Sequence, residues 1–287
     1  MTDDSKDAIT TLAVRSVEGA VSPRVRHISQ SLIRHLHAFV RDVAPTEEEW
    51  MAGVAFLTRT GQMCSETRQE FILLSDVLGV SMMVDAINNQ LPPEATETTV
   101  FGPFYVPPPS FEAGADIRGA LEGAPLFISG VVRASDGTPV AAATIDIWHS
   151  DAEGFYDVQR QDDRPGLAAR GRFRSADNGS FSLWTVRPTS YPIPDDGPVG
   201  DLLRLQGRHP FRPEHVHFMI TAPGFRKLVT HLFAEGDDYL ASDVVFGVKP
   251  SLVRPIALHP AGTAAPDGTI VEEAWHDLRA DFVLGPV

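Results

Sequence analysis

The sequence predicts an α+β protein in which a helical N-terminal part is followed by an antiparallel β-sandwich. Only Pro23 and Pro45 precede residue 91, whereas the other 21 of 23 prolines follow it, and glycine is divided in the same way. Because proline breaks helix interiors and glycine serves turns, this asymmetry marks the end of a helical region. Apolar residues also recur every three or four positions before that point and alternate beyond it. We therefore expect a helical domain over residues 1–105 and a sandwich domain over residues 106–287.

Composition narrows the class of protein. With 287 residues, of which 43% are hydrophobic, the chain can build a full core. The single cysteine, Cys64, excludes a disulfide scaffold and is expected to be a buried structural thiol. A formal charge of −14 argues against nucleic-acid binding, and no apolar run approaches the ~18 residues that span a bilayer. The N-terminus is polar and acidic, unlike a signal peptide, so we expect a cytoplasmic enzyme or binding protein.

The first ninety residues carry helix signals. Behind Ser22 and Pro23 an apolar stripe has the spacing of one helix face, and it consists of Val25, Ile28, Leu32, Leu36, Phe39 and Val43. Thr46 and Glu49 form a capping box, and the helix that follows is expected to stop near Gly61 and to turn inward its apolar residues Trp50, Met51, Val54 and Leu57. Further helices are expected over residues 65–77 and 82–89. So much apolar surface on these helices predicts an oligomer interface.

Beyond residue 90 the pattern changes to short strands and turns. A proline-rich connector over residues 91–125 is too rigid for a flexible linker. Alternating patterns then predict strands over residues 126–134, 143–148, 180–186, 215–221, 227–233 and 277–284. Short strands separated by turn residues are typical of an antiparallel sandwich.

The strongest chemical signal is the pair His215 and His217. On a strand these side chains project from the same face about 7 Å apart, close enough to share one metal ion. The plainer alternative is a pair of hydrogen-bonded or surface histidines. His35 and His37 have the same spacing on a predicted helix, where the rings point to different faces, so we assign them no role.

Tyrosine is scarce, with four in the chain, and two of them lie in polar, turn-rich segments. Tyr156 follows a predicted strand, and Tyr191 begins a segment rich in proline, aspartate and glycine. Loop tyrosines with hydroxyls in water are the plainer interpretation of both.

Together these residues resemble the intradiol ring-cleavage dioxygenases, non-haem Fe(III) enzymes that open catechol-type rings. The likeness covers nearly the whole chain and is carried by motifs in order: GVVxxxDGTPV (130–140), IDIWHSDAEGFYD (145–157), RGRFR (170–174), YPIPDDGPVG (191–200) and HPFRPEHVHF (209–218). The resemblance implies that iron is bound by Tyr156, Tyr191, His215 and His217. A hard ferric ion favours anionic oxygen donors, tolerates imidazole and displaces the phenol proton.

The resemblance also implies a reaction. An aromatic diol and O2 would react so that the ring opens between its two hydroxyl-bearing carbons, giving a cis,cis-muconate-type dicarboxylate. We choose Tyr191 as the tyrosinate that the diol displaces and that accepts a proton. Arg212 matches the family arginine thought to stabilise negative charge on the ring, the alternative being a surface ion pair. The helical segment then becomes the linker and dimer contact, and the sandwich becomes the catalytic domain.

Within that family the chain looks most like the hydroxyquinol (benzene-1,2,4-triol) 1,2-dioxygenases, whose product is 3-hydroxy-cis,cis-muconate (maleylacetate). The likeness includes LVTHLF (228–233) and the pair Ser242 and Asp243. The implied substrate-binding residues are Leu73, Asp76, Val100, Phe101, Gly102, Pro103, Phe104, Ile193, Pro194, Arg212 and His231. The carboxylate of Asp76 could accept a hydrogen bond from the third hydroxyl, the alternative being a solvated helix residue. His231 stands where catechol enzymes usually have a glutamine, so a supporting role is expected of it.

Three other functions stay open at this point. The first is cleavage of catechol or chlorocatechol by the same chemistry. The second is a transthyretin-like sandwich that binds a partner without metal chemistry. The third is a ferrous dioxygenase that uses His215, His217 and a carboxylate.

Overall fold

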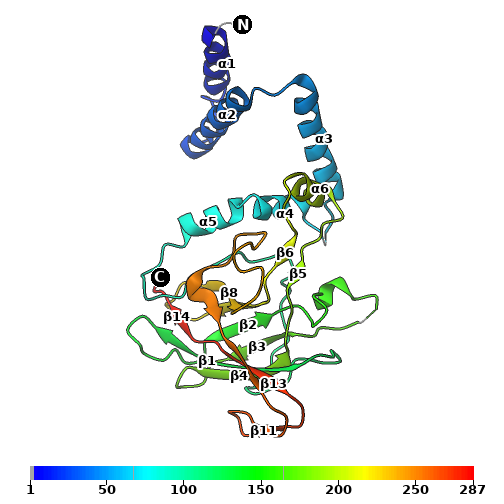
Figure 1. Cartoon of the computed structure of the whole chain (residues 1–287). Helices are drawn as coiled ribbons and strands as arrows, with labels where there is room; N and C mark the ends of the chain where they lie inside the picture. The colour runs from blue at the N-terminus through cyan, green and yellow to red at the C-terminus, as the bar shows by residue number, and fades with distance from the viewer. Residues whose placement is uncertain (1–2, 67, 164) are drawn as a thin grey trace. The chain divides into compact units, whose positions relative to one another are not determined.

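A computed structural model describes residues 3–66, 68–163 and 165–287 (Figure 1). The chain divides into two compact units, Met1–Arg59 and Thr60–Val287. Within the described ranges, no helix combines the length and the apolar character that crossing a membrane requires.

The first unit contains α1 (Asp3–Arg15), α2 (Pro23–Val43) and most of α3 (Glu47–Met63). The predicted helix start at Ser22 and Pro23 and the predicted capping box of Thr46 and Glu49 are both confirmed. The hydroxyl of Ser22 accepts a hydrogen bond from the backbone N of Val25 at 3.2 Å. Thr46 and Glu49 exchange two hydrogen bonds at 3.2 and 2.8 Å, so two otherwise unpaired N–H groups of the first turn are satisfied.

The apolar side chains of α2 and α3 are exposed within the single chain. Phe39 is 61% exposed and Trp50 58%, and none of the α2 residues is buried. The expectation that the apolar side of α3 turns inward is therefore wrong for this chain by itself, since Trp50, Met51, Val54 and Leu57 are all exposed. Helical periodicity identifies an apolar face without identifying what covers it.

The second unit begins with two short helices, α4 (Glu70–Val77) and α5 (Val80–Asn88), separated by Gly79 in the left-handed conformation (φ 72°). The helix predicted from residue 65 starts later, because Ser65 is engaged in hydrogen bonds with Arg68 that close a turn. A further helix, α6 (Pro198–Leu205), was not predicted. In Figure 1 these three helices lie on one side of the sheets.

Two five-stranded sheets hold most of the strands in the described part of the chain. The first contains β1 (Pro125–Ala134), β4 (Ser180–Val186), β10 (Ile256–His259), β13 (Trp275–Arg279) and β14 (Phe282–Leu284). The second has the order β3 (Arg170–Arg174), β2 (Thr144–Trp148), β7 (His215–Thr221), β8 (Leu228–Ala234) and β9 (Val253–Arg254). Two-stranded ladders join β5 (Tyr191–Pro192) to β6 (Phe211–Arg212) and β11 (Thr263–Ala264) to β12 (Ile270–Val271).

The predicted sandwich is confirmed, and its strand pairings are mixed. Most are antiparallel, but β1 pairs in parallel with β13 and β14, and β8 with β9. The main core lies between the sheets and includes Ile128 and Leu183 from the first and Ile147 and Phe218 from the second.

The single strand predicted over residues 277–284 is broken in two between β13 and β14. At the break a Cβ on Gly130 of β1 would lie 1.7 Å from the carbonyl oxygen of Ala280, so the two backbones meet too closely for a side chain. Strand β3 was missed because RGRFR lacks the β-branched character by which strands are recognised.

Candidate metal centre and substrate pocket

The histidine pair is positioned by β7. Its alternate residues Val216 and Phe218 belong to the sandwich core, so His215 and His217 face away from that core, as strand alternation requires. His217 pairs across the sheet with Trp148 on one side and His231 on the other. The indole ring of Trp148 stacks on the His217 ring at 4.7 Å between centroids and fixes its orientation. The structure thus makes Trp148 a supporting residue that the sequence did not single out.

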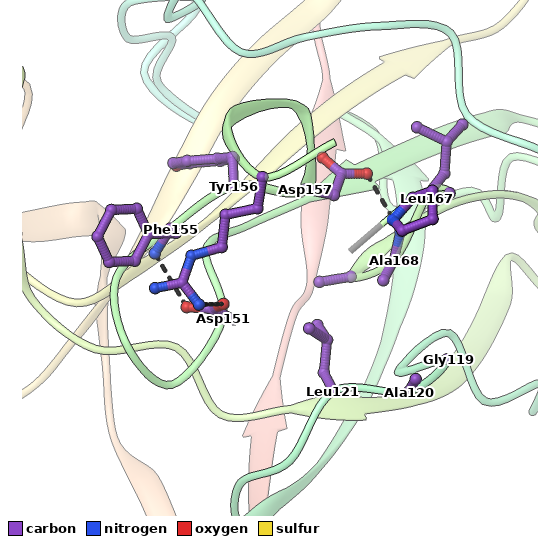
Figure 2. A pocket seen from close by; sticks show the side chains of 13 residues that line it. Gly119, Ala120, Leu121, Asp151, Phe155, Tyr156, Asp157, Leu167 and Ala168 are labelled. Carbon is purple, nitrogen blue, oxygen red and sulfur yellow. Dashed lines mark hydrogen bonds and ion pairs between the residues drawn. The ribbon is translucent and has the colours of Figure 1, made fainter. Parts of the chain in front are cut away.

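Tyr156 lies on the loop that follows β2, and it is fully buried. The carboxylate of Asp151 accepts hydrogen bonds from the backbone N of Glu153 and of Phe155, both at 2.9 Å. Gln159 accepts from the backbone N of Tyr156 at 2.8 Å, and the carboxylate of Asp157 forms an ion pair with buried Arg170. Figure 2 shows this loop from the side of a cavity of about 400 Å³. The loop is a closed, hydrogen-bonded turn, so the plainer interpretation of Tyr156 as solvated is wrong.

Tyr191 approaches from a different segment. It pairs in register with Arg212 through the β5–β6 ladder and is 5% exposed. A Cβ on Gly154 would lie 2.7 Å from Cβ of Tyr191, so glycine (φ 89°) lets the two tyrosine loops pack together. Tyr191 is therefore buried as well, and both tyrosines face the histidine pair.

Four donor atoms converge at one point. The phenol oxygen of Tyr156 lies 3.1 Å from that of Tyr191 and 2.9 Å from Nε2 of His217. Nε2 of His215 lies 3.5 Å from each phenol oxygen and 3.2 Å from Nε2 of His217. Donors bound to one ion at about 2.1 Å, with bond angles near 90–110°, lie about 3.0–3.4 Å apart. The measured separations fit a single shared metal ion.

The protonation of the cluster also suits a metal. Nδ1 of His215 lies 2.6 Å from the carbonyl oxygen of Pro213, which can only accept, so Nδ1 carries the proton and Nε2 keeps its lone pair. Burial lowers the pKa of His215 and of His217 well below the usual value, so both rings are neutral. Burial raises the pKa of Tyr156 and Tyr191, and the two phenols would lose their protons when a cation binds.

The donor set distinguishes between kinds of metal site. Across the described residues, no group of three or more His, Cys, Asp or Glu side chains could hold a metal ion. A site of two histidines and one carboxylate is therefore absent from that part of the chain. Two phenols with two imidazoles fit a hard, highly charged cation such as Fe(III).

Arg212 lies beside the donor cluster and is 4% exposed. Its guanidinium nitrogens lie 3.2 Å from Nε2 of His215 and 3.3 Å from Nδ1 of His231. The carboxylate of Asp243 faces it at 3.2 Å, which contradicts the alternative of a surface ion pair. From the sequence, Asp243 is recognised only as part of a motif. Its pairing with Arg212 could not be predicted, because the two residues are 31 positions apart.

The predicted pocket residues come mainly from α4, the connector and the segment after β5. Leu73, Val100 and Ile193 are buried in one apolar cluster with Val199 of α6 and Val245. Asp76 is 6% exposed, so the alternative of a solvated helix residue is wrong. Burial raises the pKa of Asp76, opposed by a hydrogen bond from Ser81 and the charge of Arg212.

The connector residues lie at different depths. A Cβ on Gly102 (φ 77°) would lie 3.0 Å from Cε1 of His217, so this glycine lies against the candidate ligand ring. The ring of Phe104 stacks on Tyr156 at 4.5 Å. Phe101 is 40% exposed and contacts Trp148 at 5.7 Å between rings. Pro103 is exposed, and Pro194 is half-buried.

The fold and the site together define a class: a β-sandwich protein in which two tyrosines and two histidines converge, with a buried apolar cluster in the same unit. Family models describe the same chain, with "Catechol dioxygenase N terminus" matching residues 22–96 and "Dioxygenase" matching residues 102–286. The chain belongs to the intradiol ring-cleavage dioxygenases.

Relatives of known activity are similar over nearly the full length. Hydroxyquinol 1,2-dioxygenase of Nocardioides simplex is 50% identical over 95% of this chain and 93% of its own. 6-Chlorohydroxyquinol 1,2-dioxygenase of Cupriavidus pinatubonensis is 47% identical over 97% of this chain and 96% of its own. The crystal structure of hydroxyquinol 1,2-dioxygenase from Pseudomonas putida superposes with a TM-score of 0.93, at 45% identity over 100% of both chains. The transthyretin-like binding module is therefore not supported.

Proposed function

We propose that this enzyme is an Fe(III)-dependent dioxygenase that cleaves hydroxyquinol between its adjacent hydroxyl-bearing carbons. One O2 adds to one benzene-1,2,4-triol, both oxygen atoms enter the product, and no further oxidant or reductant is required. The product is 3-hydroxy-cis,cis-muconate, which tautomerises to maleylacetate. The observation that carries the proposal is the convergence of two phenol oxygens and two imidazole nitrogens, which are linked by five separations of 2.9–3.5 Å.

We assign Tyr156, Tyr191, His215 and His217 as the iron ligands. Iron bound there would supply a Lewis acid that binds the diol as its dianion and brings the ring within reach of O2. Trp148 and the carbonyl of Pro213 keep the two imidazole rings in the orientation that this role requires.

Tyr191 and Arg212 have the catalytic roles in this proposal. Tyr191 lies on a two-stranded ladder outside the main sheets. Its phenol oxygen would hold the iron before the diol binds and would then act as the base that takes a substrate proton. Arg212 carries a permanent positive charge next to Nε2 of His215, where it stabilises negative charge on the bound ring. His231 contacts Arg212 from the neighbouring strand and holds it over the pocket.

The preference for a triol rests on Asp76 and on the similarity to hydroxyquinol enzymes. The buried carboxylate of Asp76 would accept a hydrogen bond from the third hydroxyl of hydroxyquinol, and catechol has no hydroxyl at that position. The remaining pocket residues, Leu73, Val100, Phe101, Gly102, Pro103, Phe104, Ile193 and Pro194, are proposed to form the apolar walls.

Oxygen uptake measured side by side with hydroxyquinol, catechol and chlorocatechols tests the substrate. Hydroxyquinol should give the highest kcat/KM, and a clearly higher value for catechol or a chlorocatechol would support that alternative substrate. The purified protein should also show visible tyrosinate-to-iron charge-transfer absorption. Fully iron-loaded but colourless protein would contradict the assignment of the two tyrosines.

The helical segment is proposed to form a homodimer. Exposed apolar residues on α2 and α3, such as Phe39 and Trp50, need a cover that a second copy would supply, with or without a lipid between the helices. Light scattering of the eluted protein measures the mass, and extraction with solvent detects a lipid. We retain the boundary at residue 105 between linker and catalytic domain, and a cytoplasmic location, as proposals from the sequence.

A further inference from the structure

Glu70 is a carboxylate buried outside the metal centre. It is 0% exposed, on the first turn of α4. Its Oε2 accepts a hydrogen bond from Nε of Arg68 at 2.9 Å, and its Oε1 accepts one from the backbone N of Val199 at 3.1 Å. Burying a charged carboxylate is costly unless its hydrogen bonds are satisfied, so both contacts must persist in the folded protein.

The contact with Val199 caps a helix from outside its own segment. Val199 lies in the first turn of α6, and the N-cap residue Gly197 makes no side-chain capping bond. Glu70 thus supplies the acceptor and negative charge that the first turn of a helix favours. A Cβ on Gly197 would lie 2.6 Å from Oε1 of Glu70, so glycine is required for this approach. Arg68 completes the connection through an ion pair with Asp196 at 2.7 Å.

The two segments joined in this way carry opposite parts of the proposed pocket. The buried residues of α4 are Glu70, Leu73, Asp76 and Val77, whose spacing places them along one face of the helix. On the other side, α6 directly follows the segment that contains Tyr191 and Ile193. Leu73, Ile193 and Val199 pack in one apolar cluster, and Glu70 is the charged contact that joins the same two segments.

We propose that Glu70 is a positioning residue that sets the distance between Asp76 on α4 and the Tyr191 segment. It acts by holding the N-terminus of α6 and does not contact the substrate. The inference rests on the proposed function, because the residues it positions are the proposed substrate pocket. Loss of the carboxylate frees the N-terminus of α6, so the pocket widens on the side of Tyr191 and Ile193.

The test compares iron-loaded Glu70→Ala and Glu70→Gln with wild type. Glu112→Gln, on the exposed connector, controls for loss of one negative charge, and Ile128→Val, in the sandwich core, controls for lost stability alone. We expect Glu70→Ala to raise KM for hydroxyquinol about tenfold, with a smaller change in kcat, since a charge-assisted hydrogen bond is lost. The preference for hydroxyquinol over catechol should fall. Glu70→Gln keeps one acceptor for the N–H of Val199 and should be intermediate.

Hydrogen exchange provides a readout that does not depend on turnover. In Glu70→Ala the amides of residues 191–205 should exchange faster, while those of β7 and the iron content stay as in wild type. Wild-type KM, substrate preference and exchange in Glu70→Ala would overturn the inference. If Glu70→Ala does not fold, the same wild-type values in Glu70→Gln would overturn it. Failure of the proposed function is distinguishable, because wild type itself would then lack iron or ring cleavage.

Discussion

The guanidinium of Arg212 and the carboxylate of Asp243 form an ion pair that is buried on both sides, with the two side chains 4% and 2% exposed. Asp243 also accepts hydrogen bonds from the backbone N of Gly247 at 2.9 Å and of Val245 at 3.3 Å. Its orientation is thus fixed by the backbone. Because Asp243 is fixed, Arg212 is held against His215 and His231.

Removal of Asp243 should therefore leave a charge buried without its partner. We expect Asp243→Ala to lower the free energy of unfolding by about 3–5 kcal/mol and Asp243→Asn to lower it by less. Urea denaturation measures both. Exposed Asp238→Asn serves as the control and should stay within about 0.5 kcal/mol of wild type. Wild-type stability in Asp243→Ala would show that the pair does not hold Arg212.

Tyr191→Phe should reduce kcat about 100-fold or more, because it removes the oxygen that we propose to bind iron and to accept the substrate proton. Iron should remain bound through the other three ligands, and the charge-transfer absorption should shift. Stopped-flow oxygen uptake and the visible spectrum measure these effects. Tyr239→Phe is the matched control. The ring of Tyr239 stacks on that of Phe211, with 4.7 Å between the ring centroids, and Tyr239 is not one of the four donors. Equal kcat in Tyr191→Phe and wild type would refute the role of Tyr191.

Asp76→Asn should change substrate preference more than maximal rate. The amide keeps the size of the carboxyl group and one acceptor oxygen, but it loses the negative charge that would strengthen the proposed hydrogen bond from a third hydroxyl. We expect the ratio of kcat/KM for hydroxyquinol to that for catechol to fall about tenfold or more. Steady-state kinetics with both substrates measure the ratio. An unchanged ratio would remove Asp76 from substrate discrimination.

Acid should destabilise the protein partly through His149. Burial, assisted by the charge of Arg170, lowers the pKa of His149 from 6.5 to about 4. Its ring nitrogens bond to the carbonyl of Ser150 at 2.7 Å and to the hydroxyl of Thr185 at 2.8 Å. As the pH falls from 6.5 toward 4, the unfolded chain takes up a proton that the folded protein excludes, so stability falls in that window.

The contribution of His149 to this loss of stability can be isolated with His149→Gln. The lowered pKa of His149 corresponds to a loss of about 3 kcal/mol in unfolding free energy over the whole pH window, and of about 2 kcal/mol between pH 7 and pH 5. The unfolding free energies of wild type and His149→Gln are measured without iron at pH 7 and at pH 5. The advantage of wild type over the variant should be about 2 kcal/mol smaller at pH 5 than at pH 7. Parallel pH curves would show that His149 does not titrate in this way.

Much of the fold follows from local patterns. The caps at Ser22 and Thr46 could be predicted because each depends on residues three positions apart. Strands β4 and β7 were predicted at their observed bounds because their alternation is strong. The two-residue strands of the short ladders were not predicted, because two residues are too few to show an alternation of apolar and polar side chains. The parallel pairing of β1 with β13 was missed because a strand pattern specifies a buried face and not a partner.

The sequence by itself determined the helical and sandwich regions, the shared face of His215 and His217, and the motifs that contain Tyr156 and Tyr191. Only the tertiary structure decided that the four donors meet at one point, that Asp243 neutralises Arg212, and that Glu70 caps α6 from 129 positions away. The physical reason is that periodicity and capping act over a few residues. Contacts between distant segments depend on how loops and sheets pack, and no local pattern records that packing.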